Sequence, residues 1–507
     1  MSKSVLKHVP MNFLTNMIVF GLNIIINLYM TPFYITHLGI DGLGVVRMAL
    51  LLPIYIGLAT IIISGAVGRF LTLSLHEKNV NAANEFFNTS LFGISAIMLA
   101  TVPLMVYISL NITNFLNIPL IYSEQASSFF LGIFIASEIT VFSTLFLIPA
   151  YANNRLDIQN YIKIATLFLQ TSAILILFTL LSSNIIYIGY SYISASFVGL
   201  LLSILVWKEF APFLHIHRTF FKINKLKEIT SMGSWLLINQ LGSILFLSID
   251  LLVINYFFGP EATGDYSVVL QWSILIRSMA GVIASIFGPI IVISYAKKNF
   301  DEIVSYSKSA VKFMGILIAI PIGLLMGFSE ALFSLWLGFE FVKLVPLLWL
   351  MLSHLVINLT VLPLFSINTA YNKVKVPALV SLGFGAINLL LAILLSIFSD
   401  LGIYGVALAG AIVLTAKNAV FTPIYAAYIL NISWSTFIKE IKFGVITVGI
   451  STFFSYLLSF FIDIDHWIEL LLYGSFIVIV TGTIIWNGLL SKKEQELIRV
   501  KLKKKDI

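Results

Sequence analysis

Apolar runs long enough to cross a lipid bilayer recur along the whole chain of 507 residues. A run of about 20 apolar residues spans a hydrocarbon core of roughly 30 Å as a helix. With 59% hydrophobic and only 10% charged residues, the chain has more apolar surface than a soluble core can bury. The runs are continuous and do not alternate apolar with polar residues, which argues against a transmembrane barrel. The sequence therefore predicts an all-α integral membrane protein.

Hydropathy predicts about fourteen transmembrane helices joined by short loops. No small-residue cleavage site follows the first run, so we interpret it as a retained helix and not as a signal peptide. The expected spans are 11–35, 43–74, 84–109, 124–150, 161–182, 185–207, 231–257, 265–296, 309–328, 343–370, 376–398, 402–430, 441–462 and 466–490.

Lysine and arginine gather in every second loop, which indicates the orientation of the chain in the membrane. With the N-terminus inside, the basic loops hold Lys78, Arg155, Lys208, Arg218, Lys222, Lys225, Lys227, Lys297, Lys298, Lys308, Lys373, Lys375, Lys439 and the tail from Lys492 to Lys505. The opposite loops hold Asp41, Glu261, Glu330, Glu340, Asp400, Asp463 and Asp465, with Lys343 as the lone basic residue nearby. The positive-inside rule then predicts a multi-pass protein of the bacterial cytoplasmic membrane with both termini cytoplasmic.

A repeat with an offset of 220 positions organises the chain. The segment His37–Gly44 aligns with Phe257–Gly264, and Lys78–Asn79 aligns with Lys298–Asn299. Corresponding helices are six spans apart, an even number, so the two copies share one orientation and are related by a pseudo-two-fold axis along the membrane normal. This arrangement is typical of transporters.

The repeat predicts two lobes of six helices, the first over residues 1–207 and the second over 231–430. Residues 431–507 have no counterpart and are expected to add two helices and a basic cytoplasmic tail. The polar segment 208–230 is interpreted as a cytoplasmic linker between the lobes. A contact with anionic lipid or a regulatory surface is the alternative for this segment.

Amides form a polar stripe on the first span. Asn12, Asn16, Asn23 and Asn27 fall within an arc of about 60° at roughly 100° per residue. The corresponding span of the second repeat carries Asn239, Ser243 and Asp250 on a similarly narrow arc. Both stripes are expected to face a polar cavity. Hydrogen bonds between neighbouring helices are the alternative explanation.

Charged side chains within the spans are candidates for substrate and ion binding, because at mid-bilayer each costs at least about 2.5 kcal/mol. Arg277 and Lys417 lie deep in their helices and are the strongest candidate cations. Arg47 lies nearer a helix end, where snorkelling to the headgroups also explains it. Glu138, Asp250 and His354 are candidates for coupling to protons, and the offset pairs Glu138 with Asn358.

Several kinds of chemistry lack their motifs in this sequence. There is no cysteine, so disulfides and thiolate metal sites are excluded. No phosphate-binding loop and no His-Glu-x-x-His motif occurs, and no extramembrane segment is long enough for a nucleotide-binding domain. We expect a protein that is not an enzyme, with no cofactor, metal, nucleotide or nucleic acid, driven by proton or sodium coupling or by the membrane potential.

Two turns give the sequence a resemblance to a known family. Tyr34–Gly44 and Phe258–Ser267 follow the first and seventh spans. Each resembles the "Leu-Gly-x-x-x-x-Gly" turn of the polysaccharide-transporter branch (Wzx-type flippases of O-antigen or capsule repeat units) of the multidrug/oligosaccharidyl-lipid/polysaccharide exporter superfamily. The resemblance covers nearly the whole chain, including two lobes and two additional C-terminal helices.

The resemblance implies a flippase that moves undecaprenyl-diphosphate-linked oligosaccharide from the inner to the outer leaflet by alternating access. It implies that glycan, membrane lipids, a polysaccharide polymerase and a chain-length regulator as partners. Arginine and lysine suit a diphosphate, and asparagine amides suit sugars. The expected substrate-binding residues are Arg277, Lys417, Arg47, Asn23, Asn27, Asn239, Asp250, His354 and Asn358.

Three other functions remain open at this stage. A non-transporting scaffold for polymer assembly is one of them, but it gives no reason for buried cations. A multidrug or cation antiporter of the same superfamily shares the topology, although a cationic interior disfavours cationic drugs. A membrane glycosyltransferase or polymerase needs a large polar loop with catalytic groups, and none of the outer loops is long enough.

Overall fold

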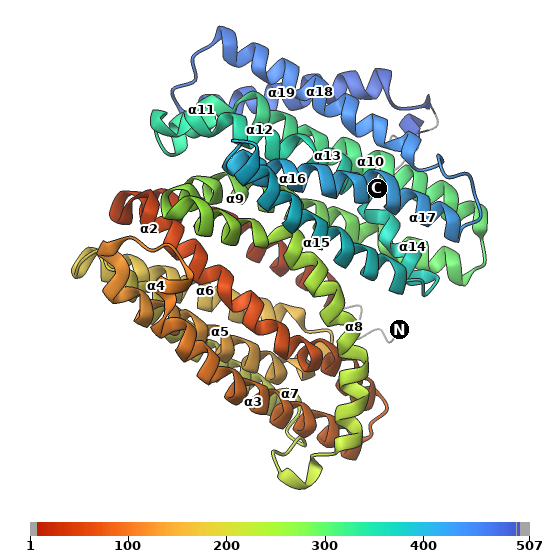
Figure 1. Ribbon diagram of the computed structural model, residues 1–507. Coiled ribbons are helices and arrows are strands. Elements are labelled where there is room, and N and C mark those ends of the chain that lie inside the picture. The colour runs from red at the N-terminus through yellow and green to blue at the C-terminus, as the bar shows by residue number, and fades with distance from the viewer. Residues whose placement is uncertain (1–7, 493, 497–507) are drawn as a thin grey trace. The chain divides into compact units, whose positions relative to one another are not determined.

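The computed structural model of the protein describes residues 8–492 and 494–496. Helices make up most of it (Figure 1). Within this described part, twelve helices are long and apolar enough to cross a membrane. The predicted all-α, multi-pass architecture is therefore confirmed. The basic tail predicted to be cytoplasmic lies largely outside the described residues.

The first compact unit ends at Ser267. Its helices are α2 (Val9–His76), α3 (Val80–Leu110), α4 (Ile112–Phe115), α5 (Leu120–Ala152), α6 (Leu156–Leu180), α7 (Ile185–Phe210), η1 (Arg218–Phe220), α8 (Ile223–Leu247) and the first part of α9 (Ile249–Ala296). Helices α5 and α7 pack most closely at two glycines, where a Cβ on Gly132 would lie 3.3 Å from Gly189 Cα. Small residues permit this backbone approach inside a membrane, where hydrophobicity does not drive helices together.

The second compact unit begins at Val268. It holds the rest of α9 and α10 (Phe300–Gly327), α11 (Ser329–Trp336), η2 (Phe339–Leu344), α12 (Val345–Ser353), α13 (Leu355–Thr360), η3 (Leu362–Leu364), α14 (Phe365–Ala370), α15 (Lys375–Phe398), α16 (Ile403–Thr415), η4 (Ala416–Phe421), α17 (Thr422–Ile429), α18 (Ile438–Phe461) and α19 (Trp467–Gly488). Helix α18 lies along α10, where Gly323 and Gly327 face Ser451 and Ser455.

The units divide inside α9 because α8 and the first turns of α9 pack with the first unit. Helix α8 contacts α2 and α3. Asn255 of α9 accepts a hydrogen bond from the backbone N–H of Asn117 (2.9 Å). The lobe boundaries at residues 207 and 231 follow the sequence repeat and not the packing, so they stay a prediction.

Glycine bends the two longest helices. Helix α2 has 68 residues and would be about 100 Å long if straight, far more than one crossing needs. It bends at Gly39, whose φ is 72°, and α9 bends at Gly259, whose φ is 83°. Only glycine adopts such a φ without steric cost. Each bend separates two of the expected spans that the continuous helix would otherwise merge.

Local structure repeats with the same offset of 220 positions as the sequence. Lys78 and Lys298 lie two residues after the ends of α2 and α9, with φ of 56° and 55°. The next residues, Asn79 and Asn299, cap α3 and α10 by accepting hydrogen bonds from Ala82 N (3.0 Å) and Glu302 N (3.2 Å). The aligned positions therefore adopt the same turn in each copy.

The turns after the two glycine bends touch each other within the first unit. A Cβ on Gly44 would collide with the carbonyl oxygen of Pro260, and a Cβ on Gly264 would collide with that of Ile40. The offset maps Ile40 onto Pro260 and Gly44 onto Gly264, so one contact occurs twice with the partners exchanged. Glycine is required at both positions because backbone faces backbone.

Candidate functional site

The tenth span is broken into short helices. The predicted span 343–370 contains α12, α13, η3 and α14, with interruptions at His354 and Val361. Pro363 has no N–H to donate to the carbonyl four residues earlier, which weakens the helix at that point. Broken helices inside a bilayer are tolerated where they are buried in protein or line a cavity, and they often form binding sites in transporters.

The twelfth span contains a π-helical turn, η4 (Ala416–Phe421), followed by Pro423 in α17. Single π-helical turns inside longer helices occur frequently at functional sites. Lys417 lies in this turn, and its Nζ is 5.8 Å from the centre of the Phe365 ring. The local backbone irregularity therefore places the predicted cation in η4, which packs against α13 of the broken span.

Polar side chains connect the tenth and twelfth spans. Asn358 Nδ2 lies 2.6 Å from His354 Nδ1 and 3.5 Å from Thr415 Oγ1. Arg277 of α9 donates from Nε to Ser273 Oγ (3.2 Å), and its charge interacts with the His354 ring. We call Arg277, His354, Asn358 and Thr415 the C-unit polar cluster. The structure thus brings together three of the predicted binding residues.

A cavity of ≈ 620 Å³ lies within the first unit between α2, α5, α6, α7 and α8. Hydroxyl and amide side chains are distributed over its lining: Thr60, Ser64, Ser137, Thr140, Ser143, Thr144, Gln159, Thr166, Gln170, Tyr192, Ser196, Ser203 and Gln240. Lys163 also lines it, and no Asp or Glu occurs in the lining among the described residues. The cavity offers hydrogen-bond donors and acceptors without negative charge.

Sequence reasoning missed this cavity, although a signal for it was present. Gln159, Lys163, Thr166 and Gln170 of α6 follow one another at intervals of three and four residues, so they share one helix face. Similar stripes of hydroxyl groups occur on α5 and α7. The asparagines of the first span were more conspicuous, but they do not line the cavity.

Arg47 adjoins this cavity. Its Nη2 donates a hydrogen bond to Thr31 Oγ1 (2.9 Å), and its charge interacts with the hydroxyl groups of Tyr34 and Tyr192. Tyr192 lines the cavity and hydrogen-bonds Gln170. A headgroup contact is therefore not needed to explain Arg47, because it has polar partners inside the first unit.

The two predicted carboxylates are buried at separate places in the first unit. Asp250, 8% exposed, accepts a hydrogen bond from the Tyr266 hydroxyl (2.9 Å). Glu138, also 8% exposed, accepts a long hydrogen bond from Thr101 (3.4 Å), and its Oε2 has no hydrogen-bond partner within the described residues. Asp250 and Glu138 belong to the first unit and His354 to the second, so each unit holds a candidate for ion coupling.

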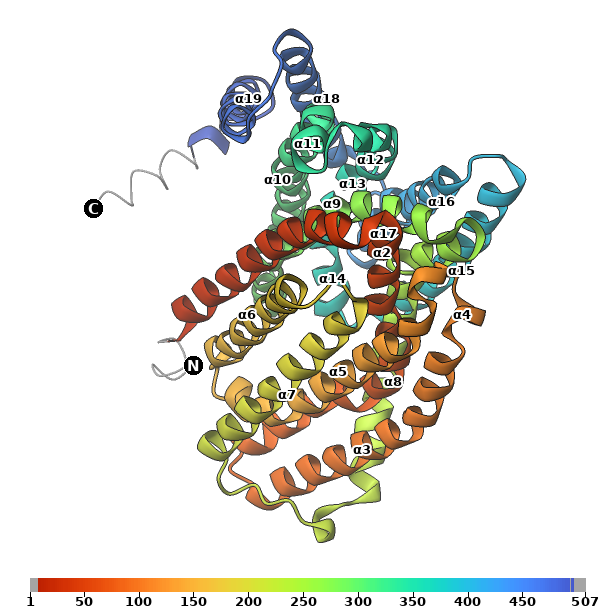
Figure 2. The same ribbon diagram turned by 90° about the vertical axis from the view of Figure 1, so that its left-hand side faces the viewer.

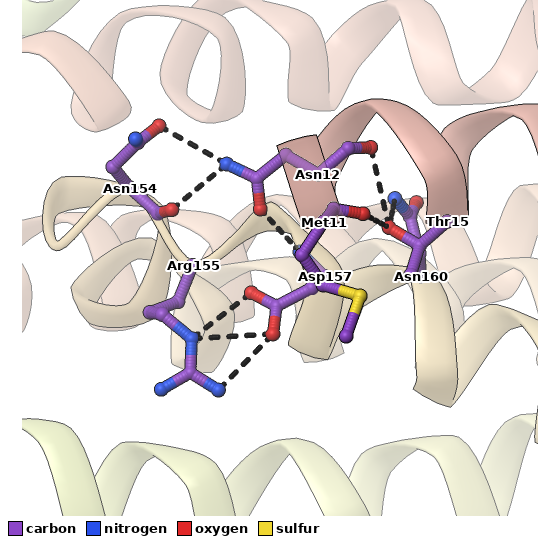
Figure 3. A network of polar contacts seen from close by, with 7 residues as sticks. All are labelled: Met11, Asn12, Thr15, Asn154, Arg155, Asp157 and Asn160. Atoms are coloured by element: carbon purple, nitrogen blue, oxygen red, sulfur yellow. Dashed lines mark hydrogen bonds and ion pairs between the residues drawn. The ribbon is translucent and has the colours of Figure 1, made fainter. Parts of the chain in front are cut away.

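The asparagine stripe of the first span has two different roles. Asn12 donates to the Asn154 carbonyl (2.9 Å) and accepts from Asp157 N (2.9 Å), which ties the start of α2 to the turn before α6 (Figure 3). Asn23 and Asn27 donate to carbonyls of their own helix, Val19 O and Asn23 O. The Asn12 end therefore makes the helix-to-helix hydrogen bonds given as the alternative. The side chain of Asn239 lies outside the described residues.

An ion pair strengthens the same turn. Arg155 Nε lies 3.0 Å from Asp157 Oδ1, and Nη2 lies 3.1 Å from Oδ2 (Figure 3). The hydrogen bonds to this carboxylate raise the pKa of the Arg155 guanidinium further. The ion pair therefore rigidifies the turn between α5 and α6 to which Asn12 binds.

Comparison with known proteins places the chain in a family. No protein-family model matches it. The uncharacterized membrane protein EpsK of Bacillus subtilis (strain 168) is 31% identical over 497 residues, which cover 97% of this chain and 98% of that protein. This chain belongs to the EpsK family of membrane proteins. Family membership extends over both units and the two C-terminal helices.

Solved structures with the same fold are transporters. The lipid II flippase MurJ in an inward closed conformation matches with a TM-score of 0.67 at 17% identity, over 94% of this chain and 100% of that chain. An inward-facing multidrug resistance MATE transporter of the MOP superfamily matches with a TM-score of 0.64 at 16% identity, over 80% and 95%. The Vibrio cholerae MATE transporter VcmN matches with a TM-score of 0.57 at 14% identity, over 87% and 98%. The EpsK-family chain therefore has the MATE and MurJ fold, as the sequence predicted.

Proposed function

We propose that this EpsK-family protein is a flippase for undecaprenyl-diphosphate-linked oligosaccharide, as its resemblance to the polysaccharide-transporter branch implies. It would move the glycan from the inner to the outer leaflet of the bacterial cytoplasmic membrane by alternating access. The fold it shares with MurJ and MATE transporters supports the transport part of this proposal.

The observation that carries the substrate class is the pair of cations next to the broken tenth span. Arg277 is in the C-unit polar cluster, and Lys417 is in the adjoining π-helical turn. Two cations inside a membrane protein are costly unless they meet negative charge or are well hydrated. A diphosphate supplies that negative charge, and arginine binds phosphate oxygens with two parallel hydrogen bonds.

The cavity of the first unit supports a sugar-bearing substrate. Sugar hydroxyls donate and accept hydrogen bonds, and hydroxyl and amide side chains do both. The lining combines such groups with apolar surface and, within the described residues, no carboxylate. The prenyl chain is expected to remain in lipid, because it is apolar and needs no polar binding site.

The coupling residues are part of the proposal as well. Asp250, Glu138 and His354 are buried or half-buried, and each is able to carry a proton. Exchange of a proton or sodium ion at one of them would couple the ion gradient to the conformational cycle. A polysaccharide polymerase and a chain-length regulator are the proposed protein partners downstream.

A multidrug or cation antiporter is the second candidate, because Asp250 and Glu138 are buried carboxylates in a MATE-like fold. Carboxylates inside a membrane attract cations. Transport measurements therefore have to include a cationic drug.

Reconstitution in vesicles tests the two candidates. A fluorescent undecaprenyl-diphosphate oligosaccharide is expected to become accessible in the opposite leaflet with wild-type protein. Arg277→Ala and Lys417→Ala are each expected to slow this process about tenfold or more, since a hydrogen bond to a charged group contributes roughly 1.5–3 kcal/mol. A cationic dye is expected not to be accumulated.

Arg69→Ala and Lys439→Ala are the matched controls, because both residues are exposed and lie outside the site. They are expected to flip the glycan at the wild-type rate. Unchanged flipping by both site variants would refute the cationic binding site. Accumulation of the dye, without movement of the glycan, would favour the antiporter.

A further inference from the structure

The connection between α7 and α8 is held against α3 by two asparagine side chains one helical turn apart. Asn84 Nδ2 donates to the Phe213 carbonyl (3.1 Å), and its Oδ1 accepts from His215 N (2.8 Å). Asn88 repeats the pattern, donating to the His215 carbonyl (2.8 Å) and accepting from His217 N (2.9 Å). The two side-chain amides thus bond the backbone N–H and C=O groups of residues 213–217, as a neighbouring β-strand would do.

Burial shows that this attachment belongs to the packed interior of the first unit. Asn84 is 2% exposed, and Asn88 and Thr89 are fully buried. Thr89 accepts a hydrogen bond from Lys222 N (3.0 Å), and Leu214 enters the hydrophobic core between the bonded residues. The linker that the sequence predicted is therefore a fixed part of the first unit. We call residues 213–223 the docked linker; it lies beside the N-terminal end of α3 in Figure 2.

Apolar side chains point outward from the docked linker. Large hydrophobic residues that are 37–56% exposed occur at four of its positions: Phe213, Ile216, Phe221 and Ile223. The linker begins three residues after the end of α7, so its start lies within about 10 Å of that helix end. Exposed apolar groups this close to the end of a membrane-spanning helix can enter the boundary between headgroups and acyl chains.

Cations alternate with these apolar groups. Residues 213–227 contain Arg218, Lys222, Lys225 and Lys227 and no acidic residue. Lys225 is engaged by Glu228 (3.2 Å) and lies 4.4 Å from the Phe86 ring. The other three make no ion pair within the described residues. The surface is therefore both apolar and positively charged, and its negative counterpart is not supplied by the chain around it.

We propose that the docked linker is a binding site for the headgroups of anionic phospholipids in the leaflet it faces. The combination of basic and apolar side chains is typical of segments that lie in a membrane interface. Because Asn84 and Asn88 fix the backbone, binding does not have to order this segment, and the lipid meets a preformed surface. The positive-inside pattern places that surface on the cytoplasmic side.

A single-cysteine probe tests the proposal, and the chain contains no other cysteine to interfere. Ile216→Cys, at an exposed position, is labelled with an environment-sensitive fluorophore. The protein is reconstituted in nanodiscs of phosphatidylcholine alone or with phosphatidylglycerol at one part in three. We expect a blue shift and several-fold weaker quenching by an aqueous quencher only in the discs with anionic lipid.

Two double variants separate this site from general attraction to basic loops. Arg218→Ala with Lys222→Ala is expected to abolish the dependence on phosphatidylglycerol. Lys297→Ala with Lys298→Ala, in the basic turn between α9 and α10, is expected to preserve it. Equal signals in the two kinds of disc, or a shift that survives loss of Arg218 and Lys222, would overturn the proposal and favour a protein partner for this surface.

Two further measurements do not depend on those variants. Glycerol phosphate added to discs without anionic lipid is expected to leave the probe unchanged, and a full shift would show recognition of free phosphate instead of lipid. Native mass spectrometry of the unlabelled wild-type protein is expected to show several-fold more retained phosphatidylglycerol than phosphatidylcholine, and equal retention would contradict the site. Neither readout involves transport, so the result is independent of the proposed function.

Discussion

Buried polar side chains in this protein differ in whether their hydrogen-bonding groups are satisfied. Asn88 is fully buried and uses both its Nδ2 and its Oδ1 in hydrogen bonds to the docked linker. Ser90, two residues further along α3, is equally buried, but its hydroxyl has no hydrogen-bond partner within the described residues. A buried donor or acceptor that loses its partner costs about 1–3 kcal/mol. The same burial therefore has opposite consequences for substitution at these two positions.

Replacing Asn88 with alanine is expected to destabilise the protein by roughly 2 kcal/mol, because the His217 N–H and the His215 carbonyl lose their buried partner. The measurement is the apparent Tm of purified protein in detergent. Ser90→Ala is the matched control and is expected to leave the Tm unchanged or slightly higher. Equal effects of the two substitutions would mean that the docked linker does not depend on the asparagine.

Glycine, proline and a π-helical turn interrupt helices for different reasons in this fold. Gly39 and Gly259 supply a positive φ where a long helix bends. Pro363 removes a hydrogen bond in the broken tenth span, and η4 places Lys417 on an irregular backbone. Gly44 and Gly264 have helical φ and are needed for space instead. Substitutions are therefore expected to cause backbone strain at Gly39 and Gly259, and steric collision at Gly44 and Gly264.

A methyl group at Gly44 is expected to destabilise the protein by about 1–3 kcal/mol, since it meets the rigid backbone carbonyl of Pro260. The control is Gly21→Ala in the same helix, where nothing lies within 4 Å of an added Cβ. That change is expected to be neutral or to stabilise by up to about 1 kcal/mol. Thermal unfolding of both variants checks the difference, and a stable Gly44→Ala variant would show that the two turns separate easily.

An ion pair joins the segment that follows α19 to α10. Lys312, only 7% exposed, lies 2.8 Å from Glu494 Oε2, and Ser491 also donates to Glu494 (2.7 Å). Burial raises the pKa of Glu494, but the hydrogen bonds from Lys312 and Ser491 outweigh it and leave that pKa below the ordinary value. A lowered carboxyl pKa contributes stability that is present above the unfolded pKa of about 4.3 and is lost as the pH falls through the folded pKa.

Protection against hydrogen exchange, relative to the intrinsic rate at each pH, is therefore expected to be high near neutral pH at the C-terminal end of α19 and to be lost as the pH falls below about 4. Glu494→Gln is expected to show the lower protection already at neutral pH. Glu440→Gln is the control, because the Lys308–Glu440 pair is longer (3.6 Å) and Lys308 is 44% exposed. Protection that does not change in Glu494→Gln would rule out the ion pair as the attachment.

At the scale of the whole molecule, hydropathy identifies the helices that are long and apolar enough to cross a membrane. The twelve long apolar helices of the described part agree with the expected spans once the two bent helices are divided at their glycines. The fold is shared with transporters at only 14–17% identity. Such a fold tolerates extensive substitution because its lipid-facing surface requires apolar residues and not particular ones.

The predicted topology is testable with single cysteines, since the chain has none of its own. Leu401→Cys, between the eleventh and twelfth spans, is expected to react with a membrane-impermeant maleimide added to intact cells. Ser433→Cys, after the twelfth span, is expected to react only after permeabilisation. Both positions are exposed, so their reactivity reports the side of the membrane. The reverse pattern would invert the topology that the positive-inside rule predicts.

The sequence by itself determined the membrane class, the positions of the spans and the internal repeat. These features follow from local quantities, namely the length of apolar runs and the turn residues between them. Even the residues at the repeated turns, Gly39 with Gly259 and Asn79 with Asn299, adopt the local structure that the alignment implied.

Only the tertiary structure decided which polar side chains meet. It joined Asn12 to the turn before α6, lined the cavity with stripes from α5, α6 and α7, and brought His354 and Asn358 to Arg277. It also fixed the linker on α3. The physical reason is that hydropathy specifies that a helix crosses the membrane but not its rotation about its own axis. That rotation is set by packing between helices distant in sequence, and with it the partner of each buried polar group.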